Sequence, residues 1–295
     1  MPIKLKKLDT ASPAFAVTGL SSIVIKAGLE IDAGTWGVTI DNETPVELVD
    51  PVAGQDYAIV VNLAGEARAL PYDDADPAAT IGGFHFAPGG NADARSGGDE
   101  TPQINPYSVW DQNFRPSCLD PRGMALVDGR FWADIYLLGV RHRESGTSRY
   151  AVKIADGYSP PQKLDSDAKF DRFTWFIAND VYAHHGKTLL SVIDFFDAAF
   201  GVTEETSAWD DPDGTGLDAA RTSKWGLMQA TGNMWTWGHD GDPDKPKAYI
   251  LGGSWGNGSD AGSRASDWRY LPSFSNSFFG ARGRSDHLNL DELAR

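Results

Sequence analysis

The sequence predicts an α+β fold in which a small all-β domain precedes a larger, loop-rich domain. Short β-type runs fill positions 20–70, two helical patterns occur in the second half, and the 295 residues include 32 glycines and 10 tryptophans. Large rings beside residues without side chains are typical of irregular backbone packed around aromatic anchors. The length also favours two domains, because compact domains usually hold roughly 100 to 200 residues.

The first 80 residues contain apolar runs of strand length. Ile23–Ile25, Val46–Val49 and Tyr57–Val61 are rich in β-branched residues, and turn residues separate them. Leu63–Glu66 can turn the chain back toward Ala67–Leu70, which would close a hairpin. We therefore expect this segment to form a β-sandwich.

A change in composition marks the boundary between the two domains. Residues 71–103 are rich in Asp, Pro, Ala and Gly, a mixture typical of loops. We place the boundary near residue 80, with the β-sandwich domain over residues 1–80 and the second domain over residues 81–295.

Two segments of the second domain show the apolar spacing of helices. The first lies between a possible N-cap at Asp171 and a stop at Gly186. The second lies between a possible N-cap at Ser191 and a stop at Gly201. Beyond residue 222 the helical period disappears, and glycine, serine and asparagine alternate with aromatic residues.

The charge of the chain excludes several classes of partner. The 26 basic and 41 acidic residues give a formal net charge of -15, which repels phosphate backbones and anionic membranes. We therefore expect no nucleic-acid partner. We also expect no membrane insertion, because the longest apolar runs, such as Ile135–Val140, fall far below the ~20 residues of a membrane-spanning helix. Asp9 and Ser12 interrupt any secretory signal, so a cell-encoded chain would be cytoplasmic.

Three patterns could carry chemistry, and we expect none of them to do so. Gly252–Gly256 matches the nucleophile elbow of serine hydrolases, with Asp267 and His287 downstream, but the glycine-rich residues that follow cannot propagate the required helix. The adjacent His184 and His185 would diverge by ~100° on a helix, so they cannot readily chelate one ion. The sequence therefore predicts no catalytic residue, no metal ligand and no cofactor.

A calcium loop is the third pattern. Asp240, Asp242 and Asp244 imitate its first three ligands, but Lys245 occupies the required glycine position and Leu251 that of the bidentate glutamate. A solvated acidic loop is the favoured interpretation, with a looser calcium site as the alternative.

Three motifs follow one another in a specific order: Gly186–Leu190 before a helix, Thr231–Trp237, and Leu251–Trp255 followed by Gly280–Gly283. Together they resemble the formylglycine-generating-enzyme branch of the C-type lectin fold. A longer series runs through Gly82–Gly89, Tyr107–Asp111, Asp120–Met124, Phe131–Val140, Thr222–Gly226 and Asp286–Leu288. This series more closely resembles the variable proteins diversified by retroelements, particularly the phage major tropism determinants.

The resemblance implies a C-type lectin-like domain over residues 81–295, with a variable region at about 250–285. The diversified, ligand-binding positions would be Ser254, Gly256, Asn257, Gly258, Asp260, Asp267, Arg269, Tyr270, Phe274, Asn276, Phe278 and Phe279. Large aromatic side chains mixed with small polar ones are typical of a binding surface. The alternatives are a core position for Phe278 or Phe279 and simple turn geometry for Gly256 and Gly258.

The same resemblance implies scaffold roles for the residues between these positions. They are Trp255, Ser263, Arg264, Trp268, Pro272, Gly280, Ala281 and Arg282. Bulky rings and fixed turns can hold irregular backbone in place.

The implied function is non-enzymatic binding of a macromolecule, with a cell-surface protein as the expected ligand. A phage tail-fibre tip is the expected location and a trimer the expected assembly. The alternative is a metal-dependent enzyme on the same fold. Formylglycine-generating enzymes use a cysteine pair, whereas Cys118 is the single cysteine here. Iron-dependent relatives on this fold use several histidine ligands, and the six histidines of this chain show no cluster that matches them; they are His85, His142, His184, His185, His239 and His287.

Overall fold

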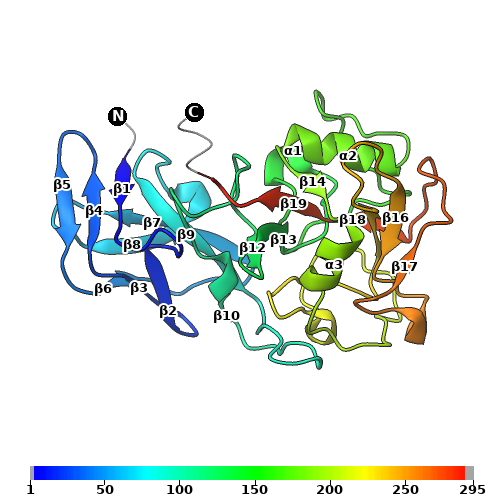
Figure 1. Ribbon diagram of the computed structural model, residues 1–295, viewed down its shortest axis with the longest axis horizontal. Coiled ribbons are helices and arrows are strands. Elements are labelled where there is room, and N and C mark those ends of the chain that lie inside the picture. Colours follow the sequence, from blue (N-terminus) through cyan, green and yellow to red (C-terminus); the bar gives the residue numbers. More distant parts are fainter. Residues whose placement is uncertain (1–2, 290–295) are drawn as a thin grey trace.

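The computed structural model describes residues 3–289 and shows a mixed α+β molecule whose regular secondary structure is mostly β-strand, with few helices. The N-terminal strands form one end of the molecule, and the α-helices lie in the C-terminal half (Figure 1). Within the described range, no helix is both long enough and apolar enough to cross a membrane. Residues 290–295 of the predicted second domain lie outside that range.

Two β-sheets in the N-terminal part share one apolar core. The smaller sheet has the order β1-β4-β5, with strands at Lys4–Lys6, Leu29–Asp32 and Gly37–Ile40. The larger sheet has the order β10-β9-β7-β8-β6-β3-β2, and β11 pairs with β9. Its strands are β2 (Phe15–Gly19), β3 (Ser22–Ile25), β6 (Thr44–Glu47), β7 (Gln55–Val61), β8 (Ala67–Pro71), β9 (Thr80–Ala87), β10 (Gln103–Ile104) and β11 (Trp110–Asp111). Leu5 and Ile31 of the smaller sheet belong to the same cluster as Ile59 and Phe84 of the larger one.

The predicted hairpin is confirmed. β7 and β8 pair antiparallel, with Val61 opposite Ala67. The Asn62 side chain accepts hydrogen bonds from the backbone N–H groups of Ala64 and Glu66, at 2.9 and 3.0 Å. An asparagine that binds the backbone of its own turn is a local signal that sequence alone contains.

The larger sheet continues past residue 80, the domain boundary predicted from the sequence. β9 pairs with β7, and every residue of β9 is buried. A Cβ atom on Gly82 would lie 2.3 Å from the Phe15 ring, and one on Gly83 would lie 2.3 Å from the Tyr57 carbonyl oxygen. Glycine in this strand therefore marks close packing of the backbone rather than a linker.

Buried polar groups bond the N-terminal sheet to the C-terminal half. The His85 ring lies 3.0 Å from the Asp56 carboxylate through Nδ1 and 2.9 Å from the Tyr136 hydroxyl through Nε2. The same carboxylate accepts a hydrogen bond from the Gly123 backbone at 3.0 Å. Because all three side chains are buried, these bonds are hidden from competing water.

The C-terminal half contains two further sheets and the helices. One sheet has the order β12-β13-β19-β14, with strands at Met124–Val127, Phe131–Asp134, Gly283–Asp286 and Thr188–Leu189. The other has the order β17-β16-β15-β18, with strands at Ser266–Asp267, Ala248–Leu251, Trp235–His239 and Phe279–Ala281. The helices are α1 (His142–Ser145), α2 (Trp175–His184) and α3 (Val192–Ala198). β18 and β19 are separated only by Arg282, so one segment belongs to both sheets.

The structure confirms one predicted N-cap and corrects the other. The Ser191 hydroxyl accepts a hydrogen bond from the Asp194 N–H at 3.1 Å and caps α3. Helix α2, however, is capped by Thr174 rather than by Asp171. The Phe173 N–H donates to the Ser275 hydroxyl at 3.0 Å. This tertiary bond holds the residues before Thr174 outside the helix.

Arg282 binds backbone from two distant segments. Its guanidinium donates to the carbonyl oxygens of Asp134 and Ile135 at 2.6 and 2.5 Å, and to that of Met228 at 2.6 Å. The side chain is fully buried, and burial lowers its pKa to about 10, so it remains charged at neutral pH. The predicted scaffold role of Arg282 thus rests on charged hydrogen bonds to main chain.

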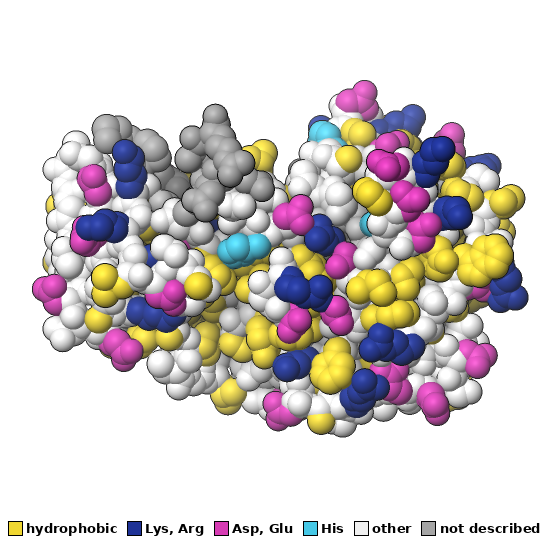
Figure 2. Space-filling model, in the orientation of Figure 1, with side chains coloured by type: hydrophobic (Ala, Val, Ile, Leu, Met, Phe, Trp, Pro, Cys, Tyr) yellow, Lys and Arg dark blue, Asp and Glu magenta, His cyan; other side chains and the backbone are white. Residues whose placement is uncertain are grey.

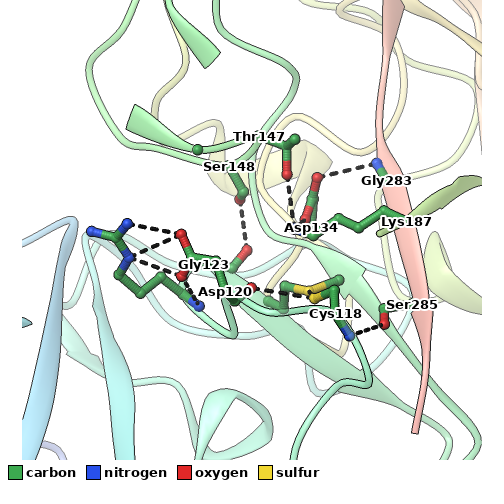
Figure 3. Close-up of polar contacts among 12 residues, drawn as sticks. Cys118, Asp120, Gly123, Asp134, Thr147, Ser148, Lys187, Gly283 and Ser285 are labelled. Atoms are coloured by element: carbon green, nitrogen blue, oxygen red, sulfur yellow. Dashed lines mark hydrogen bonds and ion pairs between the residues drawn. The ribbon is translucent and has the colours of Figure 1, made fainter. Parts of the chain in front are cut away.

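A buried ion pair reinforces the same junction. Lys187 lies 2.6 Å from the Asp134 carboxylate and 2.8 Å from the Thr147 hydroxyl, and the other carboxylate oxygen accepts from the Gly283 N–H at 3.2 Å (Figure 3). Burial would lower the pKa of Lys187, but the Asp134 carboxylate outweighs this effect and holds that pKa above its ordinary value. The charge of Asp134 is therefore compensated in the interior.

Replacing Arg282 by methionine should destabilise the fold strongly. The Arg282→Met variant leaves buried carbonyl oxygens without donors, so we expect a loss of about 3 kcal/mol or more in the free energy of unfolding. Chemical denaturation would measure this loss. The exposed Arg141→Met variant is the matched control, with an expected change within about 0.5 kcal/mol. Equal losses in the two variants would contradict the anchoring role of Arg282.

Candidate ligand-binding face

An open pocket of about 260 Å³ lies in the C-terminal half. Its lining consists of Trp235, Ser254, Gly256, Asn257, Tyr270, Phe274, Asn276, Phe278 and Phe279. All of these except Trp235 belong to the twelve positions predicted to bind ligand. The tertiary structure thus gathers most of the predicted positions at one site.

The fold brings these residues together from two loops and one pair of strands. β15 and β18 pair in parallel, which places Trp235 opposite Phe279. The Trp255 N–H donates to the Asn233 carbonyl oxygen at 3.0 Å, which fixes the loop after β16 beside β15. Tyr270 through Phe278 follow β17 and lead into β18. The pocket therefore lies where the loops flanking this sheet meet.

Aromatic rings form one side of the pocket. The Tyr270 ring centroid lies 5.2 Å from that of Phe274 and 5.3 Å from that of Phe279. Phe278 packs against Trp255, with their centroids 4.5 Å apart. Tyr270, Phe274 and Phe278 expose 40%, 39% and 37% of their surface. Each ring is thus held by a neighbour and still presents area to solvent, which lowers the conformational entropy lost on binding.

Hydrophobic side chains also gather over the C-terminal half in the space-filling view, between acidic and basic side chains (Figure 2). Such a mixed surface suits a macromolecular ligand, because apolar contact provides affinity and the charges provide selectivity.

Two of the twelve predicted positions are buried. Phe279 is 2% exposed and belongs to an apolar core cluster, so its alternative as a core residue is the correct one. Ser254 is 3% exposed, and its hydroxyl donates to the Asn257 side chain at 2.7 Å. Both residues are nevertheless part of the pocket lining. Adjacent side chains on extended backbone point to opposite faces, which explains why Phe278 is exposed and Phe279 is not.

Four predicted positions lie outside the pocket lining: Gly258, Asp260, Asp267 and Arg269. Gly258 has a φ of +54°, so its turn-geometry alternative is supported, whereas Gly256 is exposed and has no such backbone requirement. Asp260 is exposed. The Arg269 guanidinium lies 2.6 Å from the Asp267 carboxylate, and this bond lowers the pKa of Asp267.

Two predicted scaffold residues, Trp268 and Arg264, are exposed instead. Trp268 is 69% exposed, and Leu271, which is not among the predicted positions, is 70% exposed. Arg264 is also exposed and covers the Phe196 ring at 4.6 Å. Ser263, Ala281 and Arg282 are buried as a scaffold role requires. For a tryptophan among turn residues, the sequence gives no signal that distinguishes a buried scaffold anchor from an exposed surface residue.

The residues of the possible hydrolase triad bond to other partners. The Ser254 hydroxyl donates to Asn257, Asp267 pairs with Arg269, and the His287 Nδ1 accepts from the Trp132 indole at 2.9 Å.

The single cysteine, Cys118, is buried. Burial raises the pKa of its thiol, and Sγ donates to the Asp120 carbonyl oxygen at 3.3 Å (Figure 3). This thiol is therefore held in its protonated, unreactive form.

The acidic loop at Asp240 binds its own backbone. Asp240 accepts from the N–H groups of Asp242 and Lys247, and Asp242 accepts from that of Asp244. Within residues 3–289, no group of three or more His, Cys, Asp or Glu side chains has the arrangement of a metal site. These contacts agree with a solvated loop.

Buried His142 and half-buried His185 form a contact between α1 and the end of α2. His142 Nδ1 lies 2.9 Å from His185 Nε2, and His142 Nε2 lies 2.8 Å from the Gln162 carbonyl oxygen. Burial, followed by the neighbouring His142, Lys187 and His184, lowers the pKa of His185 to about 4. Burial also lowers the pKa of His142.

Comparisons with known proteins agree on one family. A family model described as the Mtd second domain matches residues 14–111. The tail fiber receptor-binding protein of Bordetella phage BPP-1 is 43% identical over an alignment 323 positions long, which covers 97% of this chain and 85% of that protein. The solved structures of the Major Tropism Determinant I1 and U1 variants have TM-scores of 0.91 and 0.90 at 40% identity. They cover 97% and 96% of this chain, which covers 86% of each.

Two adjacent phenylalanines should differ in their contribution to stability. Phe279→Ala removes a core side chain and should reduce the free energy of unfolding by about 3 to 5 kcal/mol. Phe278→Ala, its matched control, removes a partly exposed ring and should cost less than about 2 kcal/mol. Urea denaturation of both variants would measure the difference. A larger loss for Phe278→Ala would contradict the assignment of Phe279 to the core.

Stability should fall as the pH decreases from about 6.5 to 4. In this window His185 is protonated in the unfolded state but neutral in the folded state, so the unfolded state binds more protons. Thermal unfolding across this range would test the effect. His185→Gln should flatten the pH dependence of Tm; an unchanged slope would show that other groups cause it.

Proposed function

The chain belongs to the major tropism determinant family of phage tail-fibre receptor-binding proteins, and from this premise we propose that it binds a host-cell receptor through the pocket and its flanking loops. The observation that carries the proposal is the pocket lining, which is drawn almost wholly from the twelve predicted positions. This binding function is non-enzymatic, and we assign the protein no catalytic residue, metal or cofactor.

The finer architecture forms part of the proposal. We assign the two N-terminal β-sheets, which extend through β11 at Trp110–Asp111, to a β-sandwich domain. We assign the remainder of the predicted second domain, up to residue 295, to a C-type lectin-like ligand-binding domain. The variable region, about 250–285, would be diversified by a retroelement that alters exposed side chains. Main-chain bonds such as that from Trp255 to Asn233 support this assignment, because they hold the loops whatever side chains the variable positions carry.

A protein ligand and a trimeric assembly at the tail-fibre tip are the expected context. The pocket is shallow and open, so one copy would bind weakly. Several copies on one particle would raise the effective concentration of binding sites and multiply a modest affinity. Aromatic rings beside amide and hydroxyl groups favour a protein surface, as in antibody paratopes.

The exposed rings provide the test of the function. Fluorescently labelled full-length chain should bind whole cells of some strains in a bacterial panel, as scored by flow cytometry. The triple variant Tyr270→Ala, Phe274→Ala, Phe278→Ala should lose at least tenfold in binding, because aromatic anchors each contribute roughly 1 kcal/mol or more. Its melting curve should stay close to wild type.

The matched control is the double variant Leu63→Ala, Leu119→Ala, which removes exposed apolar surface outside both the pocket and its flanking loops. It should retain most of the binding. Full cell binding by the triple variant would refute the pocket as the receptor site.

A further inference from the structure

Two aromatic residues outside the variable region are almost fully exposed. Tyr158 and Trp209 show 79% and 80% of their surface to solvent, more than any aromatic side chain of the pocket. A single exposed ring needs no explanation. These two are different, because each is carried by a loop that is bonded to a loop of the pocket.

The Tyr158 loop is fixed to the segment that carries Phe274 and Asn276. The Gly157 N–H donates to the Asn276 carbonyl oxygen at 3.0 Å, and a Cβ atom on Gly157 would lie 2.4 Å from the Asn276 nitrogen. The Asp156 carboxylate accepts from the N–H groups of Tyr158 and Ser159, both at 2.6 Å. The turn is thus closed internally and held against the pocket.

The Trp209 loop is fixed to the other segment of the pocket. The Ser207 hydroxyl donates to the Trp255 carbonyl oxygen at 2.9 Å and accepts from the Gly258 N–H at 3.2 Å. The Ala208 N–H donates to the Gly232 carbonyl oxygen at 2.8 Å. Trp209 itself has a φ of +68°, which is uncommon for a bulky residue and has to be held by the surrounding bonds.

The two loops also meet each other. Lys153 and Gly214 form an isolated β-bridge, and the Ile154 N–H donates to the Asp213 carbonyl oxygen at 3.1 Å. Ile154 lies in the apolar cluster against which Trp255 packs. Tyr158, Trp209 and the pocket are therefore parts of one continuous assembly of loops.

Acidic side chains dominate the charge of these two loops. Asp156, Asp211 and Asp213 lie close enough that burial and the other two carboxylates raise the pKa of Asp211. The Lys153 Nζ lies 3.0 Å from the Asp213 carboxylate and compensates its negative charge. Exposed aromatic faces beside carboxylates attract Lys or Arg side chains through cation–π contacts and charge complementarity.

We propose that Tyr158, Trp209, Asp156 and Asp211 form an acidic aromatic rim that binds a basic segment of the receptor protein while the pocket binds a neighbouring part. The inference rests on the proposed receptor-binding function and adds the chemistry of a second contact. Because the rim lies outside residues 254–279, it would give every diversified form of the pocket a common contribution to affinity and association rate.

Octa-arginine peptide is the probe for the rim, measured by fluorescence anisotropy against full-length protein at physiological ionic strength. The double variant Tyr158→Ala, Trp209→Ala should weaken peptide binding about tenfold, as expected for two cation–π contacts. Asp156→Asn, Asp211→Asn should weaken it by a similar factor. Asparagine keeps the oxygen that caps the Tyr158 turn, so this nearly isosteric variant guards against misfolding in the first.

The matched control removes equal charge from a different acidic loop. Asp242→Asn, Asp244→Asn should change peptide binding less than twofold, although the net charge of the chain changes equally. Equal weakening by the control and the rim variants would show diffuse charge attraction and overturn the proposal, as would a wild-type chain that binds no peptide.

The pocket variant separates this inference from the proposed function. Tyr270→Ala, Phe274→Ala, Phe278→Ala should keep octa-arginine binding within twofold of wild type while it loses cell binding. Loss of cell binding in the pocket variant with unchanged peptide binding in the rim variants would refute the rim and leave the receptor function standing. Loss of peptide binding in the pocket variant would place the basic segment in the pocket and overturn the rim.

Discussion

The structure depends on the buried Arg282 guanidinium, which binds main-chain carbonyl oxygens at Ile135 and Met228. Arg282 separates the last strand of the pocket's sheet from the last strand of the neighbouring sheet, so its bonds fix both sheets at one junction. The charge is retained in the interior because carbonyl dipoles surround it. The ion pair of Lys187 with Asp134 lies at the same junction and leaves no buried carboxylate there uncompensated.

If the face is diversified as we propose, it needs support that does not depend on its own side chains. The loops of the pocket are held by main-chain groups: Trp255 bonds to Asn233, Gly258 to Ser207, and Asn276 to Gly157. Main-chain bonds survive substitution, so the exposed positions can vary at little cost in stability. The same bonds fix the loops of Tyr158 and Trp209. Support of the pocket and a constant contribution to binding would thus come from the same segments.

Local physics explains the parts of the fold that the sequence predicted well. The Ser191 cap and the Asn62 turn depend on side chains that bind backbone within three or four residues. Such interactions are complete within a short window of sequence. The β7–β8 hairpin and helix α3 follow from them. The clustering of most predicted ligand-binding positions could be predicted only from the resemblance to a known family. Local patterns could not predict it, because these positions meet across segments that are far apart in the chain.

The sequence by itself determined the mixed α+β character, the hairpin and the α3 cap, and through its resemblance to a known family it pointed to every pocket-lining position except Trp235. Only the tertiary structure decided that β9 belongs to the N-terminal sheet, that Thr174 caps α2, that Phe279 is core and that Trp268 lies in solvent. The physical reason is the same in each case. Each outcome depends on whether the fold supplies a partner distant in sequence, as it brings Phe15 against Gly82 and Ser275 against Phe173, and composition or periodicity within one segment carries no information about that partner.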